Sequence, residues 1–366
     1  MSPGTPDISG ALTALHSTFP ASQLSEDAKI LTQFGSSFGS FAPPTPPLIV
    51  VHAESTQDVV SCVKIARRFL IVLIPVGGRT SLEGHKLNNQ IHRQSPDRRS
   101  ISPSLVWTRF QRFPRISAPS LVRPGAGWQS LNQHLAEQGI KQFFPIDPAP
   151  RSEFGGMVAV AGSGTNAVGF GTMRGEWIGG MEVVWMSGEV IKTKGSSRAR
   201  ELILQASEPR RFHPPPRTKE KTDLTTRREF QAQYWSQQLL LSPTPGSPPC
   251  RTFITDICVP ISQLPLFISR SEALVNPLSP KRDPRTLRLA LDLEGTVAGE
   301  HGIGMTKRKY VRKELGQKTL GLMRKVRTLL DPMGLLNPGK VIYETVEEET
   351  RESRLWIMFR LLVCKS

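Results

Sequence analysis

The 366-residue sequence predicts an α+β fold. A strand, helix, strand pattern occupies residues 47–75, because two apolar runs flank a segment with helical spacing. Further on, Glu182–Met186 and Glu189–Thr193 alternate about Ser187-Gly188, which is typical of a β-hairpin. Near the C-terminus, an amphipathic helix is expected over about Leu315–Leu330, where Asp331-Pro332 ends it.

The N-terminal elements follow in order. The first 45 residues are rich in Ser, Pro and Gly, so a loosely ordered segment is expected there. Pro47–Val51 predicts a buried strand, and Ser55 can cap the helix that follows it. Ile71–Pro75 predicts a second strand, which leads into the Gly77-Gly78 turn.

The middle of the chain alternates between patterned and patternless stretches. Periodicity is lost from Asn88 to Ser120 and again over residues 201–250, where the composition turns to Arg, Ser and Pro. Between these stretches a helix is expected from about Trp128 to Gln138, and Gly139 is placed to end it.

The chain is expected to have five parts. Phe253–Val259 resembles a strand and Leu287–Leu293 a helix, so order returns after residue 250. The predicted division is a loosely ordered segment at 1–45, a domain at 46–200 with an irregular insert at 88–120, a low-pattern Pro/Arg-rich segment at 201–250, a truncated domain at 251–345 and a tail at 346–366.

The chain is strongly basic, with 47 Lys and Arg against 31 Asp and Glu and a formal net charge of +16. Such an excess can attract nucleic acid, an anionic membrane or acidic ligands. The basic stretches Ile91–Arg123 and Arg198–Arg228 lack the aromatic interleaving and helical phasing of a nucleic-acid face. We therefore expect no nucleic-acid partner, and a basic RNA- or membrane-associating protein is kept only as a third interpretation.

Compartment signals are weak. No stretch approaches the roughly 20 apolar residues of a membrane span, so no transmembrane segment is expected. The four cysteines are scattered without metal-type spacing, which suits a reducing compartment. Asp7, Glu26 and Asp27 precede the first arginine, Arg67, which makes a poor transit peptide.

Two glycine-rich stretches are candidates for binding an anion, because glycines let backbone N–H groups approach a phosphate. The first, residues 75–85 (PVGGRTSLEGH), follows a predicted strand and has neither P-loop nor Rossmann spacing. The second, residues 155–172, adds hydroxyls and an amide. An ordinary turn and a tight loop packed on a sheet are the alternative interpretations.

A third stretch, Gly299-Glu300-His301-Gly302-Ile303-Gly304, places a carboxylate and an imidazole on a backbone that can approach a substrate. The histidine could take a proton near neutral pH, and the carboxylate could orient it or bind a metal. A surface Glu-His pair without function is the alternative.

Together these motifs resemble the FAD-linked oxidases with a PCMH-type FAD-binding domain, most closely the D-lactate dehydrogenase (cytochrome) group. The markers come in the family's order: AESTQDVVSCVKIAR, GGRTSLEGH, VRPGAGWQSLNQHL, FPIDPAP, GGMVA, SGTNAVGFGTMR, GEVIKT, TDICVPIS, LEGTVAGEHGIG and LLNPGKVI. The resemblance implies a PCMH-type FAD-binding domain followed by a truncated FAD-linked oxidase C-terminal (substrate) domain.

The resemblance also implies a site. FAD would be held by residues of three stretches: Pro75, Gly77, Gly78, Thr80, Ser81, Gly84 and His85; Asp147, Pro148, Gly155, Gly156, Ser163, Gly164, Asn166, Gly171 and Thr172; and Asn337. His301 would be the base that takes the hydroxyl proton of a D-2-hydroxy acid. Glu300 is similar to the carboxylate that ligates a divalent metal, such as zinc or manganese, in intact relatives.

The function implied by the resemblance is oxidation of D-lactate or a related D-2-hydroxy acid to the 2-keto acid. Electrons would pass to an acceptor such as cytochrome c, and the location would be the mitochondrion.

The sequence departs from the family pattern in several places. Arg79 stands where Gly is usual, which places a long cation in the predicted cradle at a position where a positive φ would disfavour it. The GSEGTLG motif and an HxGDGNxH-like motif are absent, so Glu300 has no histidine partners for a metal. A catalytically inactive remnant or mis-spliced product, which binds FAD weakly or not at all, is therefore the alternative function.

These losses fall at 88–120, 201–250 and around 276–285. We hypothesise that these blocks are not original coding sequence. An uninterrupted transcript that encodes them would refute the hypothesis.

Overall fold

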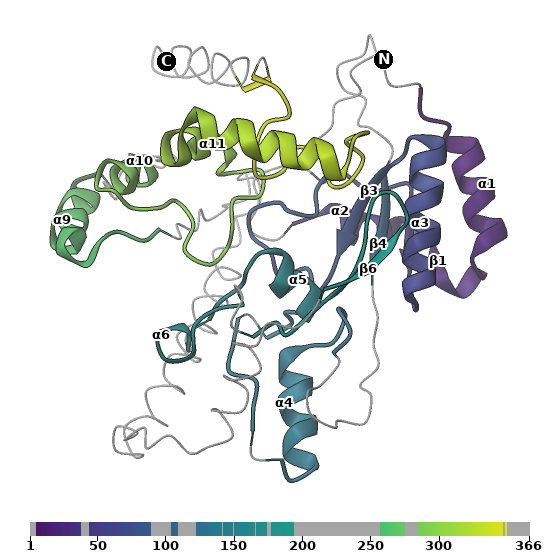
Figure 1. Ribbon diagram of the computed structural model, residues 1–366, viewed down its shortest axis with the longest axis horizontal. Helices are drawn as coiled ribbons and strands as arrows, with labels where there is room; N and C mark the ends of the chain where they lie inside the picture. Colours follow the sequence, from purple (N-terminus) through teal and green to yellow (C-terminus); the bar gives the residue numbers. More distant parts are fainter. Residues whose placement is uncertain are drawn as a thin grey trace, which may run out of the picture.

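The computed structural model describes residues 5–37, 44–88, 104–108, 122–140, 142–148, 150–164, 166–173, 177–193, 257–274, 285–346 and 348–349. In Figure 1, a sheet flanked by helices forms one side of the molecule, and a row of helices extends from it. The elements are α1 (Ile8–Thr18), η1 (Ala21–Gln23), β1 (Leu24–Ser25), α2 (Ala28–Gly35), β2 (Ile49–His52), α3 (Thr56–Phe69), β3 (Val72–Val76), β4 (Ser104–Thr108), α4 (Trp128–Glu137), α5 (Phe154–Ala159), α6 (Ala167–Phe170), β5 (Glu182–Val184), β6 (Val190–Lys192), η2 (Ile261–Gln263), α9 (Leu264–Leu274), α10 (Arg285–Asp292) and α11 (Arg308–Leu330).

The main sheet has the order β1-β2-β4-β3. Strands β2 and β3 both pair in parallel with β4, and β1 is antiparallel to β2. The predicted strand, helix, strand unit is therefore confirmed, with Ser55 and Asp58 forming a capping box at the start of α3. Its two strands are not neighbours, because β4 lies between them.

Strand β4 lies inside residues 88–120, so the prediction of an irregular insert there is wrong for Ser104–Thr108. Five residues are too few to show a period beside an Arg/Ser/Pro-rich background, and pairing with strands on both sides stabilises the extended conformation. The other residues of this block, apart from Asn88, lie outside the described residues, as do 201–250 and 276–284.

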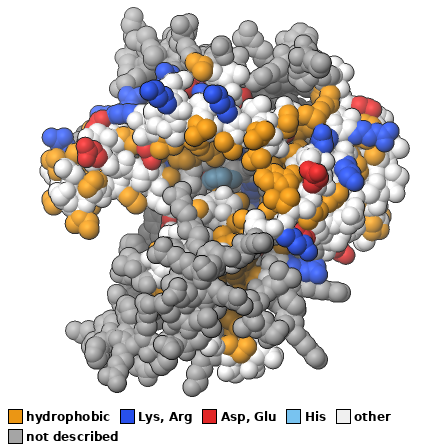
Figure 2. All heavy atoms as spheres, viewed as in Figure 1, with side chains coloured by type: hydrophobic (Ala, Val, Ile, Leu, Met, Phe, Trp, Pro, Cys, Tyr) orange, Lys and Arg blue, Asp and Glu red, His pale blue; other side chains and the backbone are white. Residues whose placement is uncertain are grey.

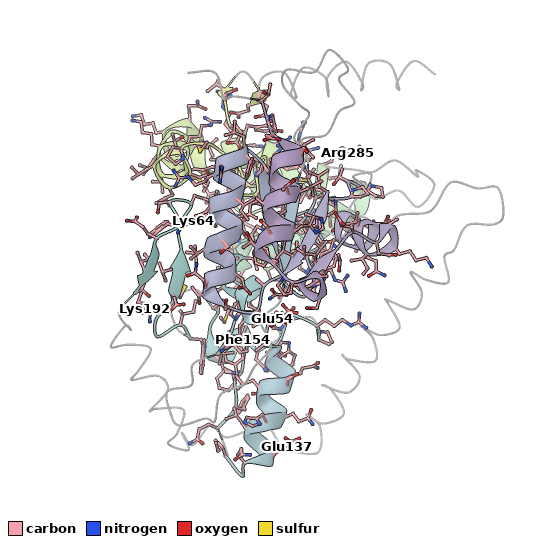
Figure 3. The ribbon with its side chains drawn as sticks, turned by 90° about the vertical axis from the view of Figure 1, so that its right-hand side faces the viewer. Glu54, Lys64, Glu137, Phe154, Lys192 and Arg285 are labelled. Carbon is pink, nitrogen blue, oxygen red and sulfur yellow. The ribbon has the colours of Figure 1, made fainter. Side chains whose placement is uncertain are left out.

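The N-terminal segment is folded, and the prediction that residues 1–45 are loosely ordered is wrong for most of them. Helix α1 is capped by Asp7, and its buried Ala11 and Leu15 pack in the same core as Cys62 and Ala66 of α3. Figures 1 and 3 both show α1 and α3 side by side. The Ser-, Pro- and Gly-rich composition hid a short helical spacing of apolar residues.

The chain returns to the first sheet after α11. Leu73 of β3 donates its N–H to Leu335 O (2.9 Å) and accepts from Asn337 N (2.8 Å). Asp331 caps this turn by accepting from the N–H groups of Leu335 and Leu336. The C-terminal end of the described chain thus extends the sheet beyond β3.

The helix predicted near Trp128, the hairpin and the helices predicted at Leu287–Leu293 and Leu315–Leu330 are confirmed with shifted bounds. Of the strand predicted at Phe253–Val259, residues 253–256 lie outside the described residues, and Cys258 forms an isolated bridge to Thr296. Helix α4 ends before Gly139, which has a φ of +69°, and β5 and β6 form the hairpin. Helix α11 begins earlier than expected and is broken at Gly316, where φ is +78°. None of the helices in the described ranges is long and apolar enough to cross a membrane.

Candidate active site

Four loops contact one another, and the first of them follows the carboxyl end of β3, where ligands bind in parallel sheets. We call residues 75–85 the first loop, 145–166 the second loop, 299–304 the third loop and 335–341 the C-terminal loop. Figure 2 shows a hollow near the centre of this face, with a histidine side chain inside it and hydrophobic side chains around it.

The first loop packs closely on the second. A Cβ added to Gly78 would clash with Arg151 O, and one added to Gly77 would lie 3.3 Å from Glu153 Oε2. The hydroxyls of Thr80 and Ser152 are hydrogen-bonded at 3.1 Å. Only glycine fits at position 78, so this glycine has a structural reason.

The second loop folds back on itself through Asp147. Asp147 Oδ1 accepts a hydrogen bond from Asn166 N (3.0 Å), and a Cβ on Gly164 would lie 2.6 Å from the Asp147 carbonyl carbon. The Nδ2 group of Asn166 donates to Pro145 O at 3.0 Å. These contacts bring the predicted residues Asp147, Gly164 and Asn166 together.

The remaining predicted residues of this stretch are more dispersed. Gly155 donates its N–H to Pro124 O (2.8 Å), whereas a Cβ on Gly156 would meet no described atom within 4 Å. Gly171 ends α6 with a φ of +78°, and Thr172 follows it. Pro148 follows Asp147 directly in the second loop.

The third loop contacts both the first loop and the second loop. Ser163 of the second loop donates to Glu300 Oε2 at 3.4 Å, and Glu300 Oε1 lies 3.6 Å from His301 Nε2. A Cβ on Gly302, whose φ is +75°, would lie 3.0 Å from His85 Nε2 of the first loop. The carboxylate and imidazole predicted to act together are therefore adjacent and border the glycine-rich loops.

His85 is an uncharged part of this site. Its Nδ1 atom is hydrogen-bonded to Ser81 Oγ. Burial, together with the nearby Lys340, Lys307 and His301, lowers the pKa of His85 to about 4. At neutral pH the imidazole of His85 is neutral.

The C-terminal loop completes the group. Asn337 has a φ of +41°, and its Oδ1 atom is buried and accepts no hydrogen bond within the part of the chain that the structure describes. Val341 donates its N–H to Gly304 O at 2.8 Å. Burial lowers the pKa of Lys340 to about 7, with Arg308 and Arg327 adding to the effect.

Arg79 does not enter the cradle, and the prediction that its cation lies there is wrong. Its guanidinium carbon lies 4.9 Å from the centre of the Phe34 ring on α2, and Nη1 donates to Gln33 Oε1 at 3.4 Å. The predicted backbone strain is confirmed, because φ at Arg79 is +61°. A cation–π contact outside the loop accounts for the direction of the side chain.

These residues fit a phosphate-bearing cofactor better than a metal. At the end of β3 the Cβ sides of Gly77 and Gly78 face Glu153 and Arg151 of the second loop, so an anion could approach this backbone only from its other side. The buried Asn337 Oδ1 is an acceptor that a donor group of such a cofactor could satisfy. By contrast, the described residues contain no group of three His, Cys, Asp or Glu side chains that could hold a metal ion.

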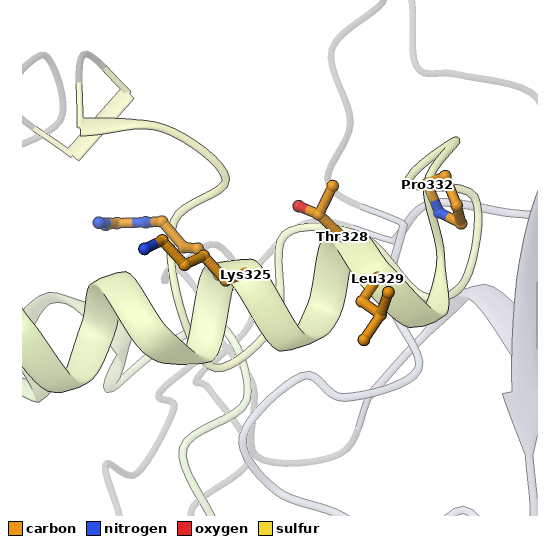
Figure 4. A pocket seen from close by; sticks show the side chains of 5 residues that line it. Lys325, Thr328, Leu329 and Pro332 are labelled. Atoms are coloured by element: carbon orange, nitrogen blue, oxygen red, sulfur yellow. The ribbon is translucent and has the colours of Figure 1, made fainter.

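A separate surface pocket of about 540 Å³ lies along α11. Figure 4 shows its lining, which comes from Arg324, Lys325, Thr328, Leu329 and Pro332. None of these residues belongs to the four loops, so this pocket is not the candidate site.

Sequence reasoning missed Glu83 and Lys307, which are both buried where the first loop meets the start of α11. They form an ion pair with an Nζ–Oε1 distance of 3.0 Å. The only local signal was a charged residue inside a glycine-rich loop. No local signal indicates a partner so far along the chain.

Comparisons with known proteins agree with the motifs. A family model described as "FAD binding domain" matches residues 47–194, and one described as "FAD linked oxidases, C-terminal domain" matches residues 282–341. The chain is 25% identical to the mitochondrial D-lactate dehydrogenase [cytochrome] of Arabidopsis thaliana, covering 81% of this chain and 73% of the relative. It is 22% identical to the D-2-hydroxyglutarate dehydrogenase of Xanthomonas citri pv. viticola, covering 93% and 98%.

Among solved structures, an alkyldihydroxyacetonephosphate synthase matches with a TM-score of 0.44 and 17% identity. The match covers 55% of this chain and 38% of the synthase chain. The resemblance read from the motifs is confirmed by the family models: the chain belongs to the FAD-linked oxidases, with a PCMH-type FAD-binding domain followed by a FAD-oxidase C-terminal domain.

Proposed function

We propose that this chain is a FAD-dependent dehydrogenase that oxidises D-lactate or a related D-2-hydroxy acid to the 2-keto acid. The observation that carries the proposal is the contact of the Glu300-His301 loop with both glycine-rich loops. The names of the relatives, D-lactate and D-2-hydroxyglutarate dehydrogenases, support this substrate class.

In this proposal, one group of residues binds FAD and another transfers the substrate proton. The first and second loops would hold the FAD phosphates, and bound FAD supplies the acceptor for the substrate hydride. His301 would accept the hydroxyl proton, because its side chain is 28% exposed and therefore within reach of a small acid. Glu300 lies beside it, with its Oε1 atom 3.6 Å from His301 Nε2.

Glu300 is itself held by Ser163, so the proposed base is oriented from the second loop. Glu300 would ligate a metal only if other ligands joined it, and the described residues offer no such group. Cytochrome c as acceptor and a mitochondrial location are further parts of the proposal, supported by the names of the relatives.

The test is anaerobic flavin reduction. The purified chain is loaded with FAD and mixed with D-lactate, D-2-hydroxyglutarate or L-lactate while the visible flavin absorbance is followed. We expect a D-acid to bleach the flavin and L-lactate to leave it oxidised.

A variant assigns the base. His301→Gln should still bind FAD but be reduced by the D-acid about 10²- to 10⁴-fold more slowly. His16→Gln is the matched control, because His16 lies on α1 with half of its side chain exposed. Equal reduction rates in His301→Gln and wild type would contradict the assigned role.

The inactive remnant is the second candidate, favoured by the missing metal ligands among the described residues. It predicts that dithionite bleaches any bound flavin but that no D-2-hydroxy acid does.

A further inference from the structure

A buried ion pair joins the first loop to the start of α11. Glu83 is 4% exposed and Lys307 is fully buried. Lys307 Nζ lies 3.0 Å from Glu83 Oε1, and Thr306 donates its hydroxyl hydrogen to Glu83 Oε2. Both oxygens of the carboxylate therefore have partners on one short segment.

The backbone repeats this connection. Glu83 O accepts a hydrogen bond from Met305 N at 2.8 Å, and Gly304, whose φ is +51°, packs so closely that a Cβ would clash with the same oxygen. Residue 83 is thus held by its main chain and its side chain together. The segment that holds it follows directly on the loop that carries His301.

The geometry of this ion pair is better suited to aligning two segments of the chain than to stabilising the fold. Removing two charges from water costs free energy that their attraction only partly repays, so an apolar pair would fill the same space as well. A carboxylate with one oxygen on an ammonium and the other on a hydroxyl, however, permits a single alignment of the two segments. An apolar contact would allow the third loop to slide.

We propose that Glu83 and Lys307 are positioning residues, whose pairing registers the third loop on the first so that FAD binding and the placement of His301 are coupled. This inference rests on the proposed function. Glu83 contacts neither the substrate nor the reacting atoms in this proposal and acts through the segment 304–307.

The test compares Glu83→Gln, Lys307→Met and the double variant with wild type. Glu83→Gln removes the carboxylate that pairs with the buried Lys307 ammonium, so the Met305 amide should exchange with deuterium about 100-fold faster. The double variant carries no charge at positions 83 and 307, and its glutamine still accepts from Thr306. Glu26→Gln is the matched control, because the Glu26–His16 pair is half exposed and remote from the loops.

Two readouts separate positioning from packing. In the double variant we expect the same resistance to urea as in wild type. We also expect kcat for flavin reduction to be about 100-fold lower with KM little changed, because the base would be misplaced while the substrate still binds. We also expect FAD to slow exchange at Met305 in wild type and not in the double variant. If the double variant regains both the stability and the kcat, the pair only fills space and the inference is overturned.

The two proposals fail differently. If no D-acid reduces the wild-type flavin, the proposed function fails while the exchange measurement still decides the coupling. If FAD slows Met305 exchange equally in wild type and double variant, the coupling fails whatever the enzyme oxidises.

Discussion

We expect the free energy of unfolding to fall at acid pH because of His85. This imidazole lies between Ser81 and Gly302, and burial lowers its pKa from the ordinary 6.5 to about 4. The positive charges facing it, Lys340, Lys307 and His301, act in the same direction. The folded protein therefore holds His85 neutral at a pH where the unfolded chain would protonate it.

The sign follows from proton uptake. Between about pH 6.5 and pH 4 the unfolded state binds more protons at this residue, so the free energy of unfolding falls as the pH falls through that window. With these two pKa values, the loss between pH 7 and pH 5 is about 2 kcal/mol. For a protein of ordinary stability that is a large share of the total.

The assay is urea unfolding followed by tryptophan fluorescence at both pH values. His85→Asn keeps a polar partner for Ser81 but cannot become charged, so it should show about 2 kcal/mol less pH dependence than wild type. His16→Asn, on the surface of α1, should show the wild-type loss. An unchanged pH dependence in His85→Asn would show that His85 is not the source of the stability loss.

Three further pairs of substitutions are compared by the same unfolding assay. Gly78→Ala should destabilise the chain by about 1–3 kcal/mol because its Cβ meets a backbone carbonyl, whereas Gly156→Ala, with open space around it, should not; equal effects would contradict the close approach. Arg79→Ala should be about 1 kcal/mol less stable than Arg79→Gly, because only glycine relieves the positive φ; the reverse order would contradict the strain. Asp331→Ala should cost about 1–3 kcal/mol by removing the acceptor for Leu335 N–H, and Asp331→Asn should cost less.

Local signals account for the parts of the fold that the sequence predicts. The capping box at Ser55 and the apolar runs on either side of it place β2, α3 and β3 without knowledge of the rest of the chain. Strand β4 and helix α1 were not predicted, each for a different reason. The first is stabilised by pairing on both edges, and the second is a short apolar spacing in a polar composition.

The site divides in the same way. The glycine-rich motifs and the Glu300-His301 pair can be recognised in the sequence because the residues of each are contiguous. That they converge is a tertiary fact, shown by Ser163 against Glu300 and by His85 against Gly302. The Glu83–Lys307 pair and the outward direction of Arg79 depend on partners distant in sequence, so no local pattern predicts them.

The most direct test of the central claim is whether the four loops hold a flavin. The purified chain is mixed with FAD, passed through a desalting column and examined for visible flavin absorbance, with Gly78→Ala run beside it. We expect flavin to elute with the wild-type protein, and less flavin or none to elute with the Gly78→Ala variant. A wild-type chain that emerges colourless, or a Gly78→Ala variant that retains as much flavin, would contradict it.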